Sequence, residues 1–331
     1  MNVLQRPLRL GFAGTPEFAV AALDALSRSR HHLLAVFTKP DKPAGRGQSV
    51  HLSPVKQRAA ELAIPVYQPA SFKTPEVLAT LRRLDLDALI VVAYGLILPP
   101  AALAVPVLGC FNIHASLLPR WRGAAPIHRA LLAGDAETGI TIMRMEAGLD
   151  TGPILAAARV KMAPRDTAGS LHDRLALLGG ELIVDTLDAL ANGSAHEVPQ
   201  PQAGVTYADK ISKSEAQIDW HEDAASVLRR VRAFNPWPIA ETRLDGAQLR
   251  IWDAELAPSP ETMPVGESAA AADAPAPPPG SVLSASDAGM DVACGRGILR
   301  ILRLQLAGRK PLAAGEFIKA QRLVGARFTT L

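Results

Sequence analysis

Residues 88–93 read Ala88-Leu89-Ile90-Val91-Val92-Ala93, a run without a single charged side chain. A short, continuous apolar run of this kind is typical of a strand that is buried on both faces. The most apolar stretch around it, Ile90–Ile97, is too short to cross a bilayer as a helix. The run therefore predicts a central strand of a parallel sheet that helices cover.

Strands and helices are expected to alternate on both sides of this run. The expected strands are Leu8–Ala13, Leu33–Thr38, Pro65–Tyr67, Cys110–His114 and Ile140–Met145, and the expected helices are Pro16–Ser27, about 54–62, about 74–83 and about 167–190. This rhythm predicts an α/β fold with a Rossmann-like, mostly parallel sheet and helices on both faces. Ligands of such sheets bind beyond the carboxyl ends of the strands, where Gly14, Tyr94 and His114 are expected to lie.

The pattern changes after residue 190. Residues 191–206 contain few core residues and several Pro, Gly and Gln, which is typical of a linker. Residues 207–331 alternate in short segments between turns, which predicts a smaller all-β barrel as the C-terminal domain. Within it, residues 257–280 are rich in Ala and Pro without periodicity, and a disordered loop is expected.

Basic residues concentrate near the end of the chain, although the formal net charge of the whole chain is only +3. Between Arg296 and Arg327 there are eight basic residues and one acid, Glu316, and eight minus one gives +7. Such a cluster suits a polyanion such as nucleic acid, because attraction to phosphates sums locally. A solvated surface also collects basic residues, so both interpretations stay open.

Cysteine and histidine spacing indicates neither a disulfide framework nor a metal site. The two cysteines, Cys110 and Cys294, lie in different halves of the chain and are expected to be buried thiols. The histidines lack paired metal-ligand spacing. The apolar run after Arg6 and Arg9 is too short for a signal peptide. We therefore expect a cytoplasmic protein without a metal cofactor or membrane contact.

Three segments contain the residues suited to chemistry. Asn112 and His114 stand at the expected end of a strand, where alternation points both side chains to the same side. A loop over residues 116–126 follows, and Gly148-Leu149-Asp150-Thr151-Gly152 then places a carboxylate in a turn. A strand-end Asn and His also act as turn caps, and an Asp between glycines is a common turn residue.

An amide, an imidazole and a carboxylate are the groups needed for acyl transfer to an amine. Asn112 and a protonated His114 can donate hydrogen bonds to the oxyanion that develops on the carbonyl. Asp150 can orient His114 or accept the amine proton, directly or through water. No activated nucleophile is required, so no covalent intermediate is expected.

The order of these motifs resembles the formyltetrahydrofolate-dependent formyltransferases. Phe111-Asn112-Ile113-His114, the loop that follows it and the Asp150 turn all match in this family. The resemblance implies that Asn112, His114 and Asp150 are catalytic and that 10-formyltetrahydrofolate is the co-substrate. The folate contacts that it implies are Val91, Ala93, Tyr94, Gly95, Leu96, Ser116, Leu117, Leu118 and Pro119.

Along nearly the whole chain, the resemblance is to family members that formylate initiator methionyl-tRNA. The matching stretches are Phe12–Ala19, Phe37–Gly47, Lys210–Ala216, Ile218–Trp220 and Asn235–Pro238. The resemblance implies an OB-like C-terminal barrel that binds tRNA, and a monomer is expected. Its implied tRNA contacts are Lys39, Lys42, Arg46, Lys210, Arg303 and Lys310, with Arg46 as the key basic residue. Residues 48–51 lack the lysines expected in this loop.

Two other functions stay open at this point. One is formyl transfer to a nucleotide sugar or to glycinamide ribonucleotide, which needs neither the Pro43–Gly47 insertion nor a basic barrel. The other is a protein that binds folate or RNA without chemistry, which has no need of all three polar groups. The Arg120-Trp121-Arg122 cluster is expected to close the folate pocket or to approach the tRNA end.

Overall fold

A computed structural model describes residues 6–44, 49–258, 277–319 and 323–330. Arg46, Arg322 and residues 259–276 of the expected disordered loop lie outside the described residues, and only the backbone of Lys42 is described. The chain forms two compact units. Unit 1 runs as far as Pro126 and includes 136–162 and 171–209, and unit 2 contains 127–135, 163–170 and the residues from Lys210 onwards. The expected boundaries 1–190, 191–206 and 207–331 stay a prediction.

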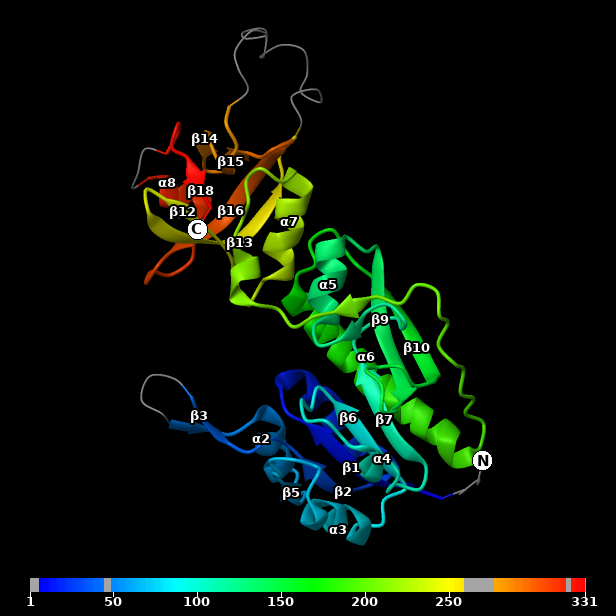
Figure 1. Cartoon of the computed structure of the whole chain (residues 1–331). Helices are drawn as coiled ribbons and strands as arrows, with labels where there is room; N and C mark the ends of the chain where they lie inside the picture. Colours follow the sequence, from blue (N-terminus) through cyan, green and yellow to red (C-terminus); the bar gives the residue numbers. More distant parts are fainter. Residues whose placement is uncertain (1–5, 45–48, 259–276, 320–322, 331) are drawn as a thin grey trace. The chain divides into compact units, whose positions relative to one another are not determined.

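A seven-stranded sheet forms the centre of unit 1 (Figure 1). Its order is β10 (Ile154–Lys161), β9 (Glu137–Arg144), β7 (Gly109–His114), β6 (Ala88–Val92), β1 (Arg9–Gly14), β2 (His32–Phe37) and β5 (Val66–Tyr67). The pairs from β7 to β5 are parallel, whereas β9 and β10 are antiparallel. The expectation of a mostly parallel sheet around residues 88–93 is confirmed. The five residues of β6, 88–92, are all buried.

Helices pack on both faces of this sheet. On one face, the core around Leu89, Val91 and Cys110 includes Leu81 of α3 (Pro75–Arg83) and Ala102 of α4 (Pro100–Leu103). On the other face lies α6 (Ala168–Asn192), since a Cβ atom at Gly179 would come within 2.8 Å of Ile113 on β7. The remaining helices of unit 1 are α1 (Val20–Arg28), preceded by the 3-10 turn η1 (Glu17–Ala19), and α2 (Pro54–Glu61). A small hairpin, β3 (Lys42–Ala44) with β4 (Ser49–His51), precedes α2.

Unit 2 is built on an antiparallel sheet. Its order is β14 (Val282–Ser286), β15 (Gly289–Ala293), β16 (Ile298–Leu306), β13 (Ala247–Leu256), β12 (Ala240–Leu244) and β18 (Phe328–Thr329), with β17 (Leu312–Ala313) beside β16. Backbone hydrogen bonds from Val282 to Ala326 and from Phe328 to Gly280 connect the two edges of the sheet. The expected C-terminal β domain is confirmed: its sheet is antiparallel, and these bonds curl it towards a barrel.

Several elements were not predicted from the sequence. Helix α5 (Pro126–Ala133) follows the loop after β7, and α7 (Ala224–Ala233) packs its buried Val227 and Val231 against the core of unit 2. Unit 2 also contains η2 (Lys213–Ala216) and α8 (Ala314–Ile318). In unit 1, β10 and the short parallel pair β8 (Arg122–Gly123) and β11 (Tyr207–Ala208) were not predicted either. Strands β8 and β11 are both important for the site described below.

Candidate active site

Strand β7 places Asn112 and His114 at the carboxyl edge of the parallel strands. Ile113 faces α6, whereas Cys110 belongs to the core on the opposite face. Because side chains alternate along a strand, Asn112 and His114 share the face of Cys110. Asn112 is half-buried, and within the described part of the chain its side chain makes no hydrogen bond. Its amide hydrogens are therefore available to a ligand.

His114 is a buried imidazole with a different neighbour at each nitrogen. Its Nε2 lies 2.7 Å from the carbonyl oxygen of Trp121. A carbonyl can only accept, so Nε2 carries the hydrogen and donates it. The other nitrogen, Nδ1, lies 3.8 Å from Oδ2 of Asp150, which is beyond hydrogen-bond distance. Nδ1 is therefore the ring nitrogen without a hydrogen-bond partner among the described residues, and it faces the carboxylate.

Asp150 is held in a strained turn between two glycines. Its φ is +51°, in the left-handed region that side chains other than glycine rarely adopt. The backbone N–H of Gly123 donates to its Oδ2 at 2.8 Å. A Cβ atom at Gly152 would overlap the carbonyl oxygen of Arg144, so the turn lies tightly against β9. The carboxylate is thus fixed beside His114.

Residues 116–119 form a loop that is fixed by one buried threonine. Thr141 pairs with His114 in the β7–β9 register. Its hydroxyl donates to the carbonyl of Ser116 at 2.7 Å and accepts from the N–H of Leu118 at 3.2 Å. The Ser116 hydroxyl in turn binds both the N–H and the carbonyl of Trp121. These contacts hold the loop next to the imidazole, and no pattern in the sequence points to Thr141.

The other expected folate contacts surround the end of β6. Val91 and Tyr94 are buried, Ala93 and Gly95 are exposed, and Leu96 is half-buried. Burial raises the pKa of the Tyr94 hydroxyl, which keeps that group protonated. Gly95 has a φ of +73°, and the ammonium of Lys39 occupies the space that a Cβ atom would fill there. Lys39, expected to contact tRNA, thus also lies at the strand ends.

Arg122 has a different place from the one expected. Its side chain is buried, and Nε and Nη2 donate to Oε1 of Gln200 at 3.1 and 2.8 Å. It therefore does not reach out to a tRNA, and the other expected role of the cluster, closing the folate pocket, stays a prediction. Arg120 lies over the ring of Trp121, 4.0 Å from its centroid. Gln200, which the sequence places in a linker, is also buried and binds the Asp150 turn.

The expected tRNA contacts in unit 2 are exposed. Arg303 lies on β16, Lys310 follows that strand, and Lys210 begins the last segment of the unit. Arg309 and Lys310 border a hollow of about 280 Å³ whose apolar wall includes Leu304 and Phe317.

The burial of Cys110 and Cys294 raises the pKa of these thiols to about 12 and about 11. Both thiols therefore stay protonated and serve as core groups.

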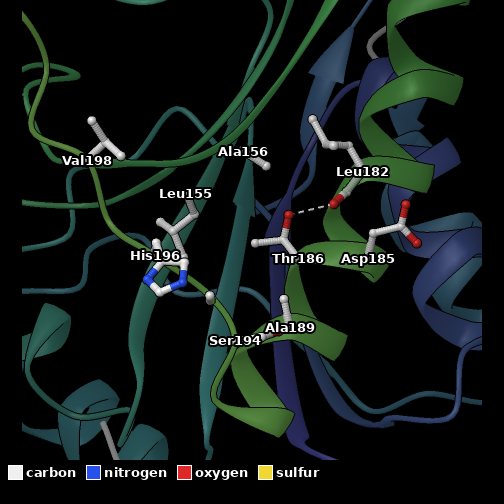
Figure 2. Close-up of a pocket in the computed structure, with 10 residues that line it drawn as sticks. Leu155, Ala156, Leu182, Asp185, Thr186, Ala189, Ser194, His196 and Val198 are labelled. Atoms are coloured by element: carbon white, nitrogen blue, oxygen red, sulfur yellow. Dashed lines mark hydrogen bonds between the residues drawn. The ribbon is translucent and has the colours of Figure 1, made fainter.

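Unit 1 also contains a hollow, which lies apart from Asn112, His114 and Asp150. Figure 2 shows its lining, and its volume is about 360 Å³. The residues belong to β10, α6 and the segment after α6: Leu155, Ala156, Leu182, Asp185, Thr186, Ala189, Ser194, Ala195, His196 and Val198. The Thr186 hydroxyl there is bonded to the carbonyl of Leu182. Asn112, His114 and Asp150 are absent from this lining.

Within the described residues, no group of three or more His, Cys, Asp or Glu side chains is placed to hold a metal ion. In the same part of the chain, every helix is too short or too polar to span a membrane.

Comparisons with known proteins identify the family of this chain. Residues 9–187 match the formyl transferase family, and residues 210–322 match the formyl transferase C-terminal domain. The chain belongs to the formyl transferase family. Relatives named methionyl-tRNA formyltransferase include one from Methylococcus capsulatus, 52% identical over 98% of this chain and 100% of its own, and one from Xanthomonas axonopodis pv. citri, 51% identical over 95% and 98%. These findings confirm the family resemblance and the expected transferase activity.

Solved structures agree on the fold of this formyl transferase. An N-formyltransferase from Helicobacter canadensis, in complex with folinic acid and dTDP-3-aminofucose, has a TM-score of 0.63 and 16% identity, covering 89% of this chain and 98% of its own. HypX from Aquifex aeolicus, in complex with tetrahydrofolic acid, has a TM-score of 0.61 and 15% identity, covering 94% of this chain and 47% of its own. At these identities the likeness concerns the fold. Membership of the family implies a folate co-substrate for this chain.

Proposed function

We propose that this protein transfers the formyl group of 10-formyltetrahydrofolate to the free amino group of initiator methionyl-tRNA, for translation initiation. The name shared by relatives about half identical along nearly the full chain supports this acceptor. The observation that carries the chemistry is the placement of three groups at one strand end. These groups are the unpaired amide of Asn112, the imidazole of His114 and the carboxylate of Asp150.

In the proposed reaction, the neutral amine attacks the formyl carbonyl carbon directly. The new carbon–nitrogen bond forms while charge develops on the carbonyl oxygen. The Asn112 amide donates a hydrogen bond to this oxygen, and a protonated His114 donates a second one from Nδ1. Because Nε2 is engaged with Trp121, Nδ1 is the only donor that the ring can offer.

The proton of the attacking amine leaves through Asp150 in this proposal. The carboxylate accepts it directly or through water, and it also orients His114. The bond between the formyl carbon and N10 of the folate then breaks, and N10 gains a proton. No covalent enzyme intermediate forms, so the proposed reaction needs no nucleophilic side chain.

We propose that the folate lies against the end of β6 and the loop after β7. Val91, Ala93, Tyr94, Gly95 and Leu96 would line one side, and Ser116, Leu117, Leu118 and Pro119 the other. The exposed backbone at Ala93 and Gly95 supports this site, because a flat, polar ring can hydrogen-bond to it.

We propose that the tRNA is bound by basic residues in both parts of the chain. In unit 1 these are Lys39, Lys42 and Arg46, and in unit 2 they are Lys210, Arg303 and Lys310. Their exposed charge in unit 2 supports this proposal. A tRNA acceptor also places the protein in the cytoplasm, where we propose that it acts as a monomer.

The direct test is an acceptor comparison. Purified protein with 10-formyltetrahydrofolate receives initiator methionyl-tRNA, a dTDP-amino sugar or glycinamide ribonucleotide in parallel. We expect formylmethionyl-tRNA and no product from the two small acceptors. Product from a small acceptor and none from methionyl-tRNA contradicts the proposal.

A further inference from the structure

We propose that Gln200 is a positioning residue for the reaction, because its carboxamide fixes the Asp150 turn beside His114. The proposal deepens the proposed function and rests on it for the identity of the reaction. Gln200 itself touches none of the reacting groups and acts through Asp150.

The orientation of the Gln200 side chain is determined by its neighbours. Its Nε2 donates to the carbonyl oxygens of Asp150 and Gly152, both at 2.8 Å. Its Oε1 accepts two hydrogen bonds from the guanidinium of Arg122. Carbonyls only accept and a guanidinium only donates, so the amide cannot turn over without losing all four bonds. With 8% of the residue exposed, water does not replace them.

These bonds hold a turn that is unfavourable on its own. Asp150 adopts a positive φ without being glycine, and such residues persist where the surroundings hold them. The two carbonyls that Gln200 binds lie on either side of Thr151, so they set the direction of the backbone that carries the Asp150 side chain. Losing them allows the turn to relax, which moves the carboxylate away from His114.

One short stretch of chain, residues 121–123, holds both members of the His114–Asp150 pair. Within residues 121–123, the Trp121 carbonyl binds Nε2 of His114 and the Gly123 N–H binds Oδ2 of Asp150. Arg122, between them, holds Gln200 and through it the Asp150 backbone. The 3.8 Å separation of Nδ1 and Oδ2 is therefore set by one piece of chain with Gln200 as a link.

The segment around Gln200 has its own anchors in the fold. Val198 and Ile154 exchange two backbone hydrogen bonds of 2.8 Å, and Tyr207 and Ala208 pair with β8. Removing the carboxamide should therefore leave the segment in place and disturb the turn. This separates a positioning role from a purely structural one.

The first test needs no acceptor. We would compare the ¹⁵N NMR resonances of the His114 ring in the wild type, Gln200→Met and Asp150→Asn, with His114→Gln to assign them. Gln200→Met keeps the length of the side chain but removes its donors and acceptor. We expect its His114 resonances to move in the same direction as in Asp150→Asn. Resonances that move only in Asp150→Asn overturn the proposal.

The second test is a double-mutant cycle on formyl transfer. We expect Gln200→Met to lower kcat about 10- to 100-fold, with KM for both substrates changed less than about 3-fold, and to shift the pH at which kcat is half-maximal. In an Asp150→Asn background the same change should cost less than about 3-fold, because Gln200 acts through Asp150. Independent, multiplying losses overturn the proposal.

Two further variants keep the cycle interpretable. Gln200→Glu still accepts from Arg122 but cannot donate to the two carbonyls, so it tests the same bonds if Gln200→Met folds poorly. Gln202→Leu changes an exposed glutamine two positions away and should leave kcat and its pH dependence unaltered. A loss in Gln202→Leu as large as in the Gln200 variants contradicts a specific role for Gln200.

Discussion

At the scale of the residue, the neighbours of a side chain decide its chemistry more than its type does. The chain has eight histidines. His114 has one nitrogen committed to a carbonyl and the other free beside a carboxylate. His31 is also buried, but its Nδ1 accepts from the N–H of Leu8, so its surroundings favour the neutral ring. One imidazole therefore keeps a nitrogen open to a ligand, whereas both the contacts and the burial of the other hold it in the neutral form.

The role proposed for His114 gives the first prediction. His114→Ala removes a donor to the developing oxyanion and should lower kcat on the order of 100-fold or more. Single-turnover formylation measures this loss without the contribution of product release. His196→Ala, an exposed histidine on the lining of the hollow in Figure 2, is the matched control. Near-normal transfer by His114→Ala would show that the oxyanion role is wrong.

His31 gives a prediction for stability against pH. Its pKa is lowered from 6.5, first because burial removes water from the charged ring, while Asp188 at 3.4 Å opposes this. Below about pH 6.5 the unfolded chain therefore binds a proton that the folded chain resists, so stability falls as pH falls. Calorimetry should give a lower Tm at pH 5.5 than at pH 7.5, and the drop should be smaller in His31→Gln. An equal drop in both proteins contradicts this origin.

At the scale of the element, alternation along a strand separates the groups that do chemistry from those that hold the core. In β7 the odd-numbered Ile113 packs towards α6, while the even-numbered Asn112 and His114 share the other face. In β13 the same period puts Leu249 and Ile251 into the core of unit 2. A shift of one residue in either strand would exchange the two sets.

Strand β13 contains a matched pair of leucines for a stability test. Leu249 is fully buried, whereas Leu256 at the end of the same strand is 50% exposed. Leu249→Ala loses buried apolar surface and leaves a cavity, so it should lower the free energy of unfolding by about 2–5 kcal/mol. Leu256→Ala should cost less than about 1 kcal/mol. Urea unfolding followed by circular dichroism measures both, and equal costs would contradict the assignment of the core.

At the scale of the whole molecule, charge is distributed unevenly. The chain carries +3 overall, yet residues 296–327 alone sum to +7. Part of this charge is not available to a ligand, because Nε and Nη2 of Arg300 donate to the carboxylate of Asp291. Arg303, Arg309 and Lys310 are exposed and form no ion pair within the described residues. The charge of these three residues is therefore available to phosphates.

This distribution predicts how tRNA binding responds to salt. Affinity should fall linearly with salt on a logarithmic plot, because each neutralised phosphate releases counterions. Lys310→Gln should reduce the magnitude of the slope by about 1. Lys161→Gln, an exposed lysine on β10, is the control and should leave the slope unchanged. A flat salt response of the wild type contradicts binding through the basic cluster.

The sequence predicted most of the sheet of unit 1 and the strands of unit 2 because their periodicity is local. The run at 88–93 and the alternating segments at 240–306 needed only the spacing of their own residues. Helix α7 was missed because it interrupts a series of strands, although Asp223 caps its start by accepting from the N–H of Ser226. That cap was a usable signal.

The sequence by itself determined the parallel sheet, the family and the identity of Asn112, His114 and Asp150 as candidates for chemistry. Each of these follows from residues close together in the chain or from a motif. Only the tertiary structure decided that Arg122 turns inwards and that Gln200, expected in a linker, binds the Asp150 turn. These contacts join residues that are about fifty or more positions apart, and no local period records which distant groups will satisfy a buried donor.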